Sequence, residues 1–280
     1  MNGAQSLLQT LVNCDVEVCF GNPGTSEMHF VAALDSVPQM RSVLCLFEGV
    51  VTGAADGYGR VAGKPAATLL HLGPGLANGL ANLHNARRAS TPLVNIVGDH
   101  ATYHLQYDAP LTSDIVGFAR PVSSWIHESK SADGVASDAA RAVQAARSAP
   151  GGVSTLILPA DTAWNEARRT EQKLPDLLPA PVSSIAIDAA ARLLSNGKKT
   201  ALLLRGASLY GAGLEAAGRV QAKTGARLLC DTFAPHAELG AGRVPVERIP
   251  YFAEQIVDFL KEFEQIILVG AKPPVSFFAY

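Results

Sequence analysis

Short apolar runs alternate with longer amphipathic or alanine-rich stretches over the first 160 residues of the chain. The apolar runs predict strands at residues 16–20, 43–47, 66–70, 93–97 and 153–158. The stretches beside them predict helices at residues 3–14, 25–34, 49–62, 76–89 and 133–148. Continuous apolar strands that alternate with helices are typical of an α/β fold with a parallel sheet covered on both faces.

The character of the chain changes at residues 166–183, which are charged and then rich in proline. We interpret this segment as a linker between a first domain at residues 1–165 and a second, Rossmann-like α/β domain at 184–280. The second domain has predicted helices at 184–195, 213–224 and 251–262, and predicted strands at 200–204, 226–230 and 265–269. It ends on apolar aromatic residues without a closing helix, so we expect it to be incomplete.

Composition narrows the class of protein. A hydrophobic content of 48% over 280 residues argues against disorder, and a net charge of -2 gives no electrostatic case for binding nucleic acid or an anionic membrane. No apolar run is long enough for a membrane span, and the N-terminus lacks the features of a signal peptide. The 4 cysteines show no metal-type spacing. We expect a cytoplasmic protein with no metal site of its own.

One carboxylate stands out from its apolar surroundings. Glu48 follows the predicted strand at 43–47 and precedes a helix rich in alanine and glycine. A buried charge is costly unless it is paired or used, and ligands of parallel α/β sheets bind at the carboxyl ends of the strands. Glu48 is therefore the first candidate for chemistry.

Three further loops follow predicted strands: residues 21–26, 71–75 and 98–100. His71 and His100 lie in two of them and are candidate proton carriers at neutral pH. The stretch HLGPGLANG imitates a dinucleotide-binding fingerprint, but its glycine spacing is wrong and its proline removes one backbone donor. A nicotinamide-dependent oxidoreductase is thus a weaker alternative, and an ordinary structural turn is another.

Taken together, five stretches resemble a known family: FGNPGTSEMHF, LFEGVVTGAADGYGR, LLHLGPGLANGLANLHNA, TPLVNIVGD and DIVGFARPV. Over residues 1–165 they resemble the N-terminal, pyrimidine-binding domain of the thiamine-diphosphate enzymes of the acetolactate synthase and benzoylformate decarboxylase family. Residues 184–280 resemble the start of that family's middle domain. The resemblance to acetolactate synthase large subunits is the strongest.

The resemblance implies a role for each loop. Glu48 matches the glutamate that hydrogen-bonds the cofactor pyrimidine N1′ and promotes proton removal from the thiazolium C2. It needs a water-poor pocket, which the apolar residues at 44, 46, 47, 50 and 51 are expected to provide. The residues expected to bind the cofactor beside Glu48 are Pro23, Gly24, Gly73, Gly75 and Asn78. Those expected to face a small 2-keto acid are Thr25, Ser26, His71 and His100.

His71 separates two possible activities. It matches a histidine that relays protons in the benzoylformate decarboxylase type, whereas many acetolactate synthases carry a small hydroxylic residue there. The resemblance implies an acetolactate synthase-like transferase or lyase that decarboxylates pyruvate or a similar acid and joins carbon fragments. A 2-keto acid decarboxylase is the alternative.

The family's third domain holds the diphosphate through Mg²⁺ with a Gly-Asp-Gly motif, and no such motif occurs in these 280 residues. We expect the chain alone to be inactive, and the complete protein to be a homodimer or homotetramer in which domains of two subunits share each cofactor. Flavin in the middle domain is possible in the family, but no sequence feature supports it. A non-catalytic half-site subunit that needs a partner chain is the alternative from another class.

Overall fold

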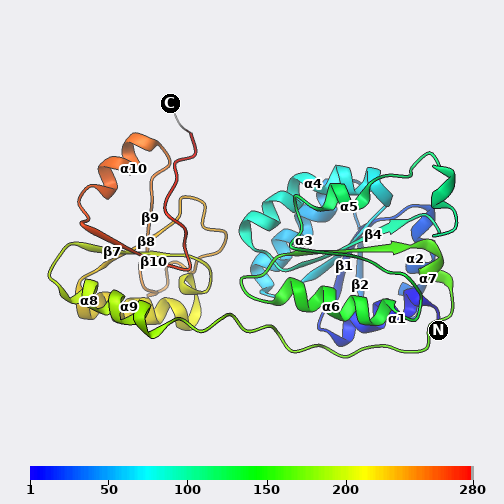
Figure 1. Cartoon of the computed structure of the whole chain (residues 1–280), viewed down its shortest axis with the longest axis horizontal. Helices are drawn as coiled ribbons and strands as arrows, with labels where there is room; N and C mark the ends of the chain where they lie inside the picture. The colour runs from blue at the N-terminus through cyan, green and yellow to red at the C-terminus, as the bar shows by residue number, and fades with distance from the viewer. Residues whose placement is uncertain (279–280) are drawn as a thin grey trace. The chain divides into compact units, whose positions relative to one another are not determined.

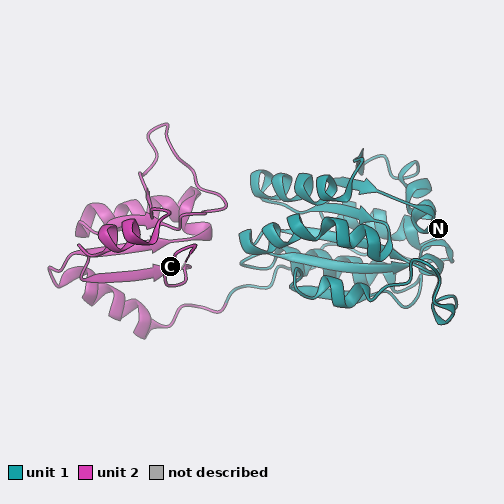
Figure 2. Ribbon diagram, turned by 90° about the horizontal axis from the view of Figure 1, so that it is seen from above, with its two compact units in different colours: residues 1–179 teal, residues 180–280 magenta. Residues whose placement is uncertain are grey.

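The computed structural model of the chain describes residues 1–278 and contains two compact units, residues 1–179 and residues 180–280 (Figure 2). Each unit has its own parallel sheet with helices packed on it, as the α/β alternation predicts. Residues 167–182, between the last helix of the first unit and the first helix of the second, contain no helix or strand.

The first unit is built on a six-stranded sheet with the order β2-β1-β3-β4-β6-β5, in which every neighbouring pair is parallel. Its strands are β1 (Val18–Asn22), β2 (Arg41–Leu44), β3 (Ala66–Leu70), β4 (Leu93–Asp99), β5 (Trp125–Glu128) and β6 (Val153–Pro159). All residues of β3, β4 and β6 are buried. Because these strands are covered on both faces, their sequences are mostly apolar and do not alternate, and the buried polar side chains Thr68, Asn95 and Thr155 hydrogen-bond to one another.

Helices cover both faces of this sheet (Figure 1). One face packs against α1 (Gly3–Asn13), α2 (Met28–Leu34), α6 (Val135–Arg147) and α7 (Ala160–Trp164). The other face packs against α3 (Glu48–Ala62), α4 (Leu72–Ala89) and α5 (Ile115–Ala119). The sheet thus has two separate hydrophobic cores, and its carboxyl edge is left to the loops.

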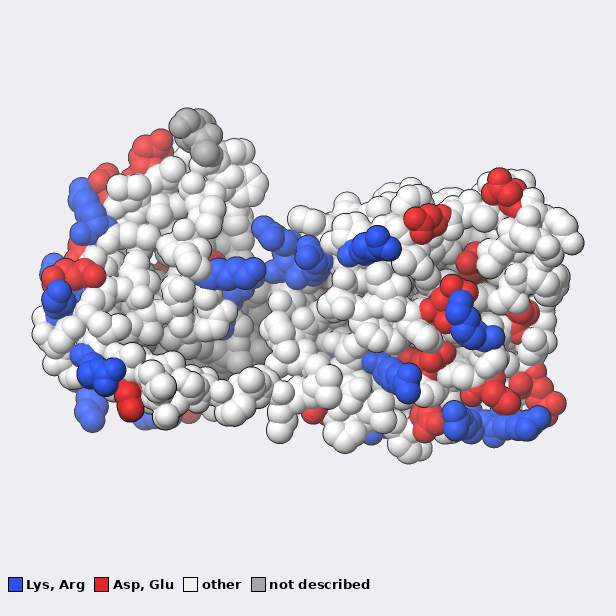
Figure 3. All heavy atoms as spheres, in the orientation of Figure 1, with Lys and Arg blue, Asp and Glu red and all other residues white. Residues whose placement is uncertain are grey.

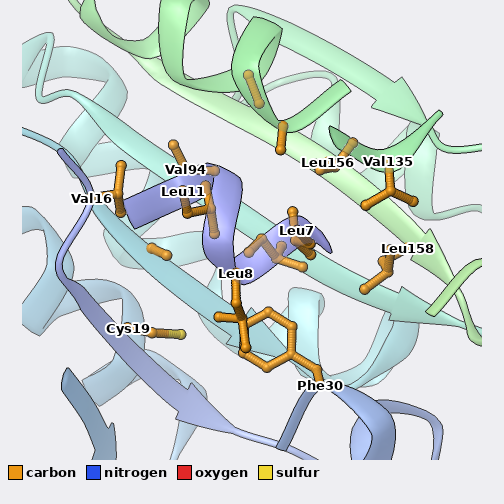
Figure 4. Close-up of a cluster of buried hydrophobic side chains, with 14 of the residues drawn as sticks. Leu7, Leu8, Leu11, Val16, Cys19, Phe30, Val94, Val135, Leu156 and Leu158 are labelled. Atoms are coloured by element: carbon orange, nitrogen blue, oxygen red, sulfur yellow. The ribbon is translucent and has the colours of Figure 1, made fainter. Parts of the chain in front are cut away.

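Helix α1 anchors the first of these cores. It begins with a capping box, in which Asn2 accepts a hydrogen bond from the Gln5 amide and Gln5 accepts one from the Asn2 amide. Its side chains Leu7, Leu8 and Leu11 are fully buried against β4 and β6, beside Phe30 of α2 (Figure 4).

The second unit is smaller and has the strand order β10-β7-β8-β9. Its strands are β7 (Thr200–Leu204), β8 (Arg227–Cys230), β9 (Glu247–Arg248) and β10 (Gln265–Val269). Its helices are α8 (Ser184–Ser195), α9 (Gly211–Thr224) and α10 (Ala253–Leu260). An ion pair of 2.6 Å between Arg205 and Asp231 links the ends of β7 and β8.

Several sequence predictions of elements were wrong. The strand expected at 43–47 is β2, which ends at Leu44 and is an exposed edge strand with a single neighbour. Helix α4 begins at Leu72 and takes the Gly73-Pro74-Gly75 segment into its first turn, where a proline is tolerated because no amide donor is needed there. The pattern missed the short elements α5, β5, α7 and β9, together with the short 3₁₀ helices Leu105–Tyr107 and Gly206–Leu209. The helix predicted at 25–34 begins as a 3₁₀ turn, Thr25–Glu27, that leads into α2.

The surface carries mixed charge. On the face shown in Figure 3, acidic and basic side chains lie side by side over the first unit, in keeping with a net charge of -2. Among the described residues, no helix has the length and hydrophobicity needed to cross a membrane.

The first core provides a test of the packing. Leu11→Ala should lower the free energy of unfolding of the first unit by about 2–5 kcal/mol, because it leaves a cavity beneath the sheet. Both tryptophans, Trp125 and Trp164, lie in the first unit, so their fluorescence during chemical denaturation reports on that unit. Val61→Ala is the control: because Val61 is 85% exposed, its truncation should change the free energy of unfolding little. Equal losses in the two variants would contradict the described packing.

Candidate functional site

The strand order brings four chemically active side chains to one edge of the sheet. Strands β2, β1, β3 and β4 are consecutive neighbours, so the loops at their carboxyl ends adjoin each other. Glu48 follows β2, Glu27 follows β1, His71 follows β3 and Asp99 ends β4. The edge is therefore the candidate site.

Glu48 is the first residue of α3 and is 7% exposed. Its Oε2 accepts a hydrogen bond of 3.0 Å from Nδ2 of Asn78. Its Oε1 accepts none from the described residues and lies beside Gly75, where an added Cβ would be 3.5 Å away. The helix N-terminus favours a negative charge at this position. The carboxylate thus keeps one acceptor oxygen for a ligand.

Helices α3 and α4 are tied together behind Glu48. The hydroxyl of Thr52 is 3.1 Å from the carbonyl of Glu48 and 3.0 Å from that of Gly79. Nδ2 of Asn82 donates a hydrogen bond of 2.8 Å to the carbonyl of Gly49. These contacts fix the start of α3 against α4, so that Glu48 and Asn78 face each other.

The apolar environment expected around Glu48 is largely missing from this chain. Leu44, Leu46, Phe47 and Val50 are 71%, 90%, 50% and 55% exposed, and only Val51 is buried. The expectation was wrong because β2 is an edge strand, and the residues after it have no further element of the described chain to cover them. Glu48 is buried by α4 instead.

Glu27 is a site residue that the sequence reasoning missed. It is 2% exposed, its Oε2 is 2.7 Å from Nδ1 of His71, and it accepts a hydrogen bond of 2.8 Å from the amide of Gly24. Burial raises the pKa of the Glu27 carboxyl, and the Gly24 amide and His71 act in the opposite direction. The available signal was a single carboxylate soon after an apolar strand, the same signal that identified Glu48.

Asp99 and His100 extend the site along β4. Asp99 is 8% exposed and accepts a hydrogen bond of 2.7 Å from the amide of His100. Burial raises the pKa of the Asp99 carboxyl, the His100 amide lowers it, and the nearby charge of Glu27 raises it. Nε2 of His100 is buried and has no hydrogen-bond partner among the described residues.

Three of the four residues expected to face a substrate line one hollow of about 240 Å³: Thr25, Ser26 and His100. Its remaining wall is made by Ala101, Tyr103, His104, Ala160 and Trp164. The rings of His100 and His104 meet edge to face, with centroids 5.6 Å apart. His71, the fourth expected residue, does not line this hollow and contacts Glu27 instead.

The other residues expected to bind the cofactor lie in tight loops. Pro23 is half-buried and precedes Gly24, where a side chain would collide with the ring of His71. A side chain at Gly73 would collide with Ser113, so this glycine is needed for packing as well. Their contacts with a cofactor stay predictions. Among the described residues, no cluster of three or more potential metal ligands occurs.

Asp99 gives a pH-dependent test of this edge. Folding raises the pKa of Asp99 above its ordinary value of 3.8, so the folded state binds the proton more tightly than the unfolded state does. The wild type therefore loses stability as the pH rises from 3.8 through the raised pKa of the folded state. Asp99→Asn removes this loss, so the stability of the variant relative to wild type should increase over the same window. Chemical denaturation at a series of pH values, followed by tryptophan fluorescence, measures it. The control Val61→Ala changes no titratable group and should show no such rise, and a flat difference for Asp99→Asn would contradict the burial.

Comparisons with known proteins identify relatives of this chain. A family model described as the thiamine pyrophosphate enzyme, N-terminal TPP binding domain, matches residues 1–118. A Mycobacterium tuberculosis protein named as an acetolactate synthase large subunit is 54% identical over 280 residues, which are 100% of this chain and 54% of that protein. The benzoylformate decarboxylase of Pseudomonas aeruginosa is 33% identical over 181 residues, 64% of this chain and 33% of the enzyme.

A solved structure shares the fold. The thiamine diphosphate-dependent 4-hydroxybenzoylformate decarboxylase of Rhodococcus jostii RHA1 matches with a TM-score of 0.83 at 22% identity, over 100% of this chain and 53% of that one. The chain spans about half the length of the first of these relatives and of the solved structure. Residues 1–118 are a thiamine pyrophosphate enzyme N-terminal domain, and the chain that contains them is homologous to acetolactate synthase large subunits and to benzoylformate decarboxylase.

Proposed function

We propose that this chain supplies the pyrimidine-binding half of a thiamine-diphosphate-dependent enzyme that acts on 2-keto acids. The observation that carries the proposal is the state of Glu48, a buried carboxylate with one oxygen bonded to Asn78 and the other without a partner among the described residues. The homology to acetolactate synthase large subunits supports decarboxylation of a 2-keto acid followed by carboligation as the reaction of the complete protein.

The residues present fit the pyrimidine of the cofactor. A ring nitrogen that carries or accepts a proton needs one carboxylate oxygen with no competing donor, and Oε1 of Glu48 meets this requirement. Gly75 beside it leaves room for a flat ring, because no Cβ projects toward the carboxylate. When bound, thiamine diphosphate supplies the electron sink for loss of carbon dioxide from the substrate. Glu48 holds and moves the proton at the pyrimidine nitrogen.

The hollow lined by Thr25, Ser26 and His100 is the proposed place for the 2-keto acid. Hydroxyl and imidazole groups are the donors that a carboxylate or a carbonyl oxygen needs. The buried Nε2 of His100 has no protein partner among the described residues, which suits a hydrogen bond to a bound oxygen. His71 is the proposed proton carrier at the neighbouring strand end.

The diphosphate and its Mg²⁺ are proposed to be held by a further domain, since the described residues contain no cluster of metal ligands. The exposed apolar residues that follow β2 are consistent with such a domain covering Glu48 from outside. We propose a homodimer or homotetramer for the complete protein, with each cofactor shared between subunits.

The assignment of Glu48 can be tested on the 280-residue chain itself. Thiamine added to the ¹⁵N-labelled chain should shift the amide signals of Glu48, Gly75 and Asn78, with a dissociation constant that rises at least tenfold in Glu48→Gln. The reason is that an amide cannot share the proton of the pyrimidine nitrogen as a carboxylate does. Glu17→Gln is the matched control at an exposed carboxylate. Equal binding by the Glu48→Gln variant, or shifts confined to other residues, would contradict the proposal.

The reaction type is decided by products. With pyruvate as substrate, a complete enzyme that includes the diphosphate-binding domain should form acetolactate, as the homology to acetolactate synthase large subunits suggests. Gas chromatography of the product mixture separates acetolactate-derived acetoin from acetaldehyde. Acetaldehyde and carbon dioxide alone would favour the decarboxylase alternative, which the histidine at position 71 supports.

A further inference from the structure

The ring of His71 is held from one side by a buried carboxylate. Nδ1 of His71 is 2.7 Å from Oε2 of Glu27, and the Glu27 side chain is only 1% exposed, whereas that of His71 is 23% exposed. The same Oε2 accepts a hydrogen bond of 2.8 Å from the amide of Gly24. Nε2 of His71 has no hydrogen-bond partner among the described residues, so it is the nitrogen that remains for a ligand.

The backbone close to Glu27 and His71 restricts where their two side chains can lie. A side chain at Gly98 would occupy the position of Oε1 of Glu27, and one at Gly24 would collide with the ring of His71. The carboxylate is therefore enclosed by backbone from β4 on one side and the β1 loop on the other. Oε1 is buried and has no partner among the described residues, so only Oε2 holds the ring.

The backbone after His71 is fixed as well. Leu72 is fully buried and adopts a left-handed conformation with φ of 51°, which is unfavourable for a residue with a side chain. Such a conformation persists only where the surroundings impose it. Here it turns the chain from β3 into α4 directly after His71 and leaves the histidine against Glu27.

We propose that Glu27 is a positioning residue for His71, which keeps the proton of the neutral imidazole on Nδ1 and leaves Nε2 as the acceptor. An ionised carboxylate only accepts hydrogen bonds, so the nitrogen beside it must donate. Oε2 accepts from the Gly24 amide and lies 2.7 Å from Nδ1 of His71, and these two contacts favour the ionised form. Burial opposes this by raising the pKa of Glu27, while Gly24 and His71 oppose the rise.

The inference rests on the proposed function, in which His71 carries a proton during the reaction. With Nδ1 bonded to Glu27, a proton can enter and leave only at Nε2, so the histidine exchanges it with one side of the ring alone. The hydrogen bond at one ring nitrogen decides whether the other nitrogen carries a proton, as in other sites where a carboxylate orients a histidine. Glu27 does not need to touch the substrate or the cofactor for this role.

Nuclear magnetic resonance of the full chain labelled with ¹⁵N-histidine tests the proposal. At alkaline pH, where the ring is neutral, long-range ¹H–¹⁵N spectra should show His71 with a protonated Nδ1 and an unprotonated Nε2. The His71 signals are identified by their loss in His71→Asn. A protonated Nε2 in the wild type, or fast averaging between the two forms, would overturn the proposal.

The variant Glu27→Leu keeps apolar volume in the buried position and removes the acceptor. It should move His71 to the form protonated at Nε2, and the signals of the other six of the 7 histidines show whether the fold is kept. Glu17→Leu, at an exposed carboxylate of the same unit, should leave His71 unchanged. If the Glu27 variant does not fold, Gly98→Ala displaces the same carboxylate, and the control Gly57→Ala has open space around it. A protonated Nδ1 that persists in either folded variant at Glu27 or Gly98 would overturn the proposal.

Uniformly ¹⁵N-labelled samples of the same proteins separate this inference from the proposed function. Thiamine-induced shifts at Gly75 and Asn78 report on the site of Glu48, independently of the proton position on His71. Normal thiamine binding with the wrong form of His71 refutes the role of Glu27 alone. A correct form of His71 without thiamine binding refutes the proposed function and leaves the contact between Glu27 and His71 in place.

Discussion

Burial of carboxylates at the carboxyl edge of the six-stranded sheet is the constraint on which the site depends. Glu27, Glu48 and Asp99 are 2%, 7% and 8% exposed, and a charge in such a position is tolerated only with nearby donors. Each has its own. Glu27 has the Gly24 amide and His71, Glu48 has Asn78 and the start of α3, and Asp99 has the His100 amide. The loops at this edge place these donors beside the carboxylates.

Glycine is what lets the loops approach so closely. Gly98 makes room for the Glu27 carboxylate, and Gly24 makes room for the ring of His71. Apart from these glycines, helix α4 is locked to α3 through Thr52 and Asn82. The result is a rigid set of acceptors and one histidine, as expected for a site that binds a ligand before any chemistry takes place.

Much of the first unit could be predicted from sequence, and the failures have physical reasons. The strands at the centre of the sheet are fully buried and mostly apolar, so β3, β4 and β6 were readily predicted. The strand at 43–47 was expected to be buried, whereas β2 ends at Leu44 and is mostly exposed. Exposure depends on which strands neighbour it, and local sequence does not encode that. Because sequence alone does not say which elements lie next to this strand, the expectation that Leu46 and Phe47 would enclose Glu48 was wrong.

The site was predicted in part for a similar reason. A lone carboxylate after an apolar strand identified Glu48, and strand ends identified His71 and His100. Glu27 was missed, because its partner His71 lies 44 residues away and only the adjacency of β1 and β3 brings them together. The direct contact of Asn78 with Glu48 likewise needs the packing of α4 on α3. Roles of the individual residues toward a cofactor stay predictions.

The central claim concerns Glu48, which is proposed to present a free carboxylate oxygen to a pyrimidine ring. A crystal structure of the chain with bound thiamine tests this claim most directly. We expect the pyrimidine nitrogen N1′ within hydrogen-bond distance of Oε1 of Glu48, with the Asn78 contact to Oε2 retained. A pyrimidine bound at another place, with no new partner for Oε1 of Glu48, would contradict the account.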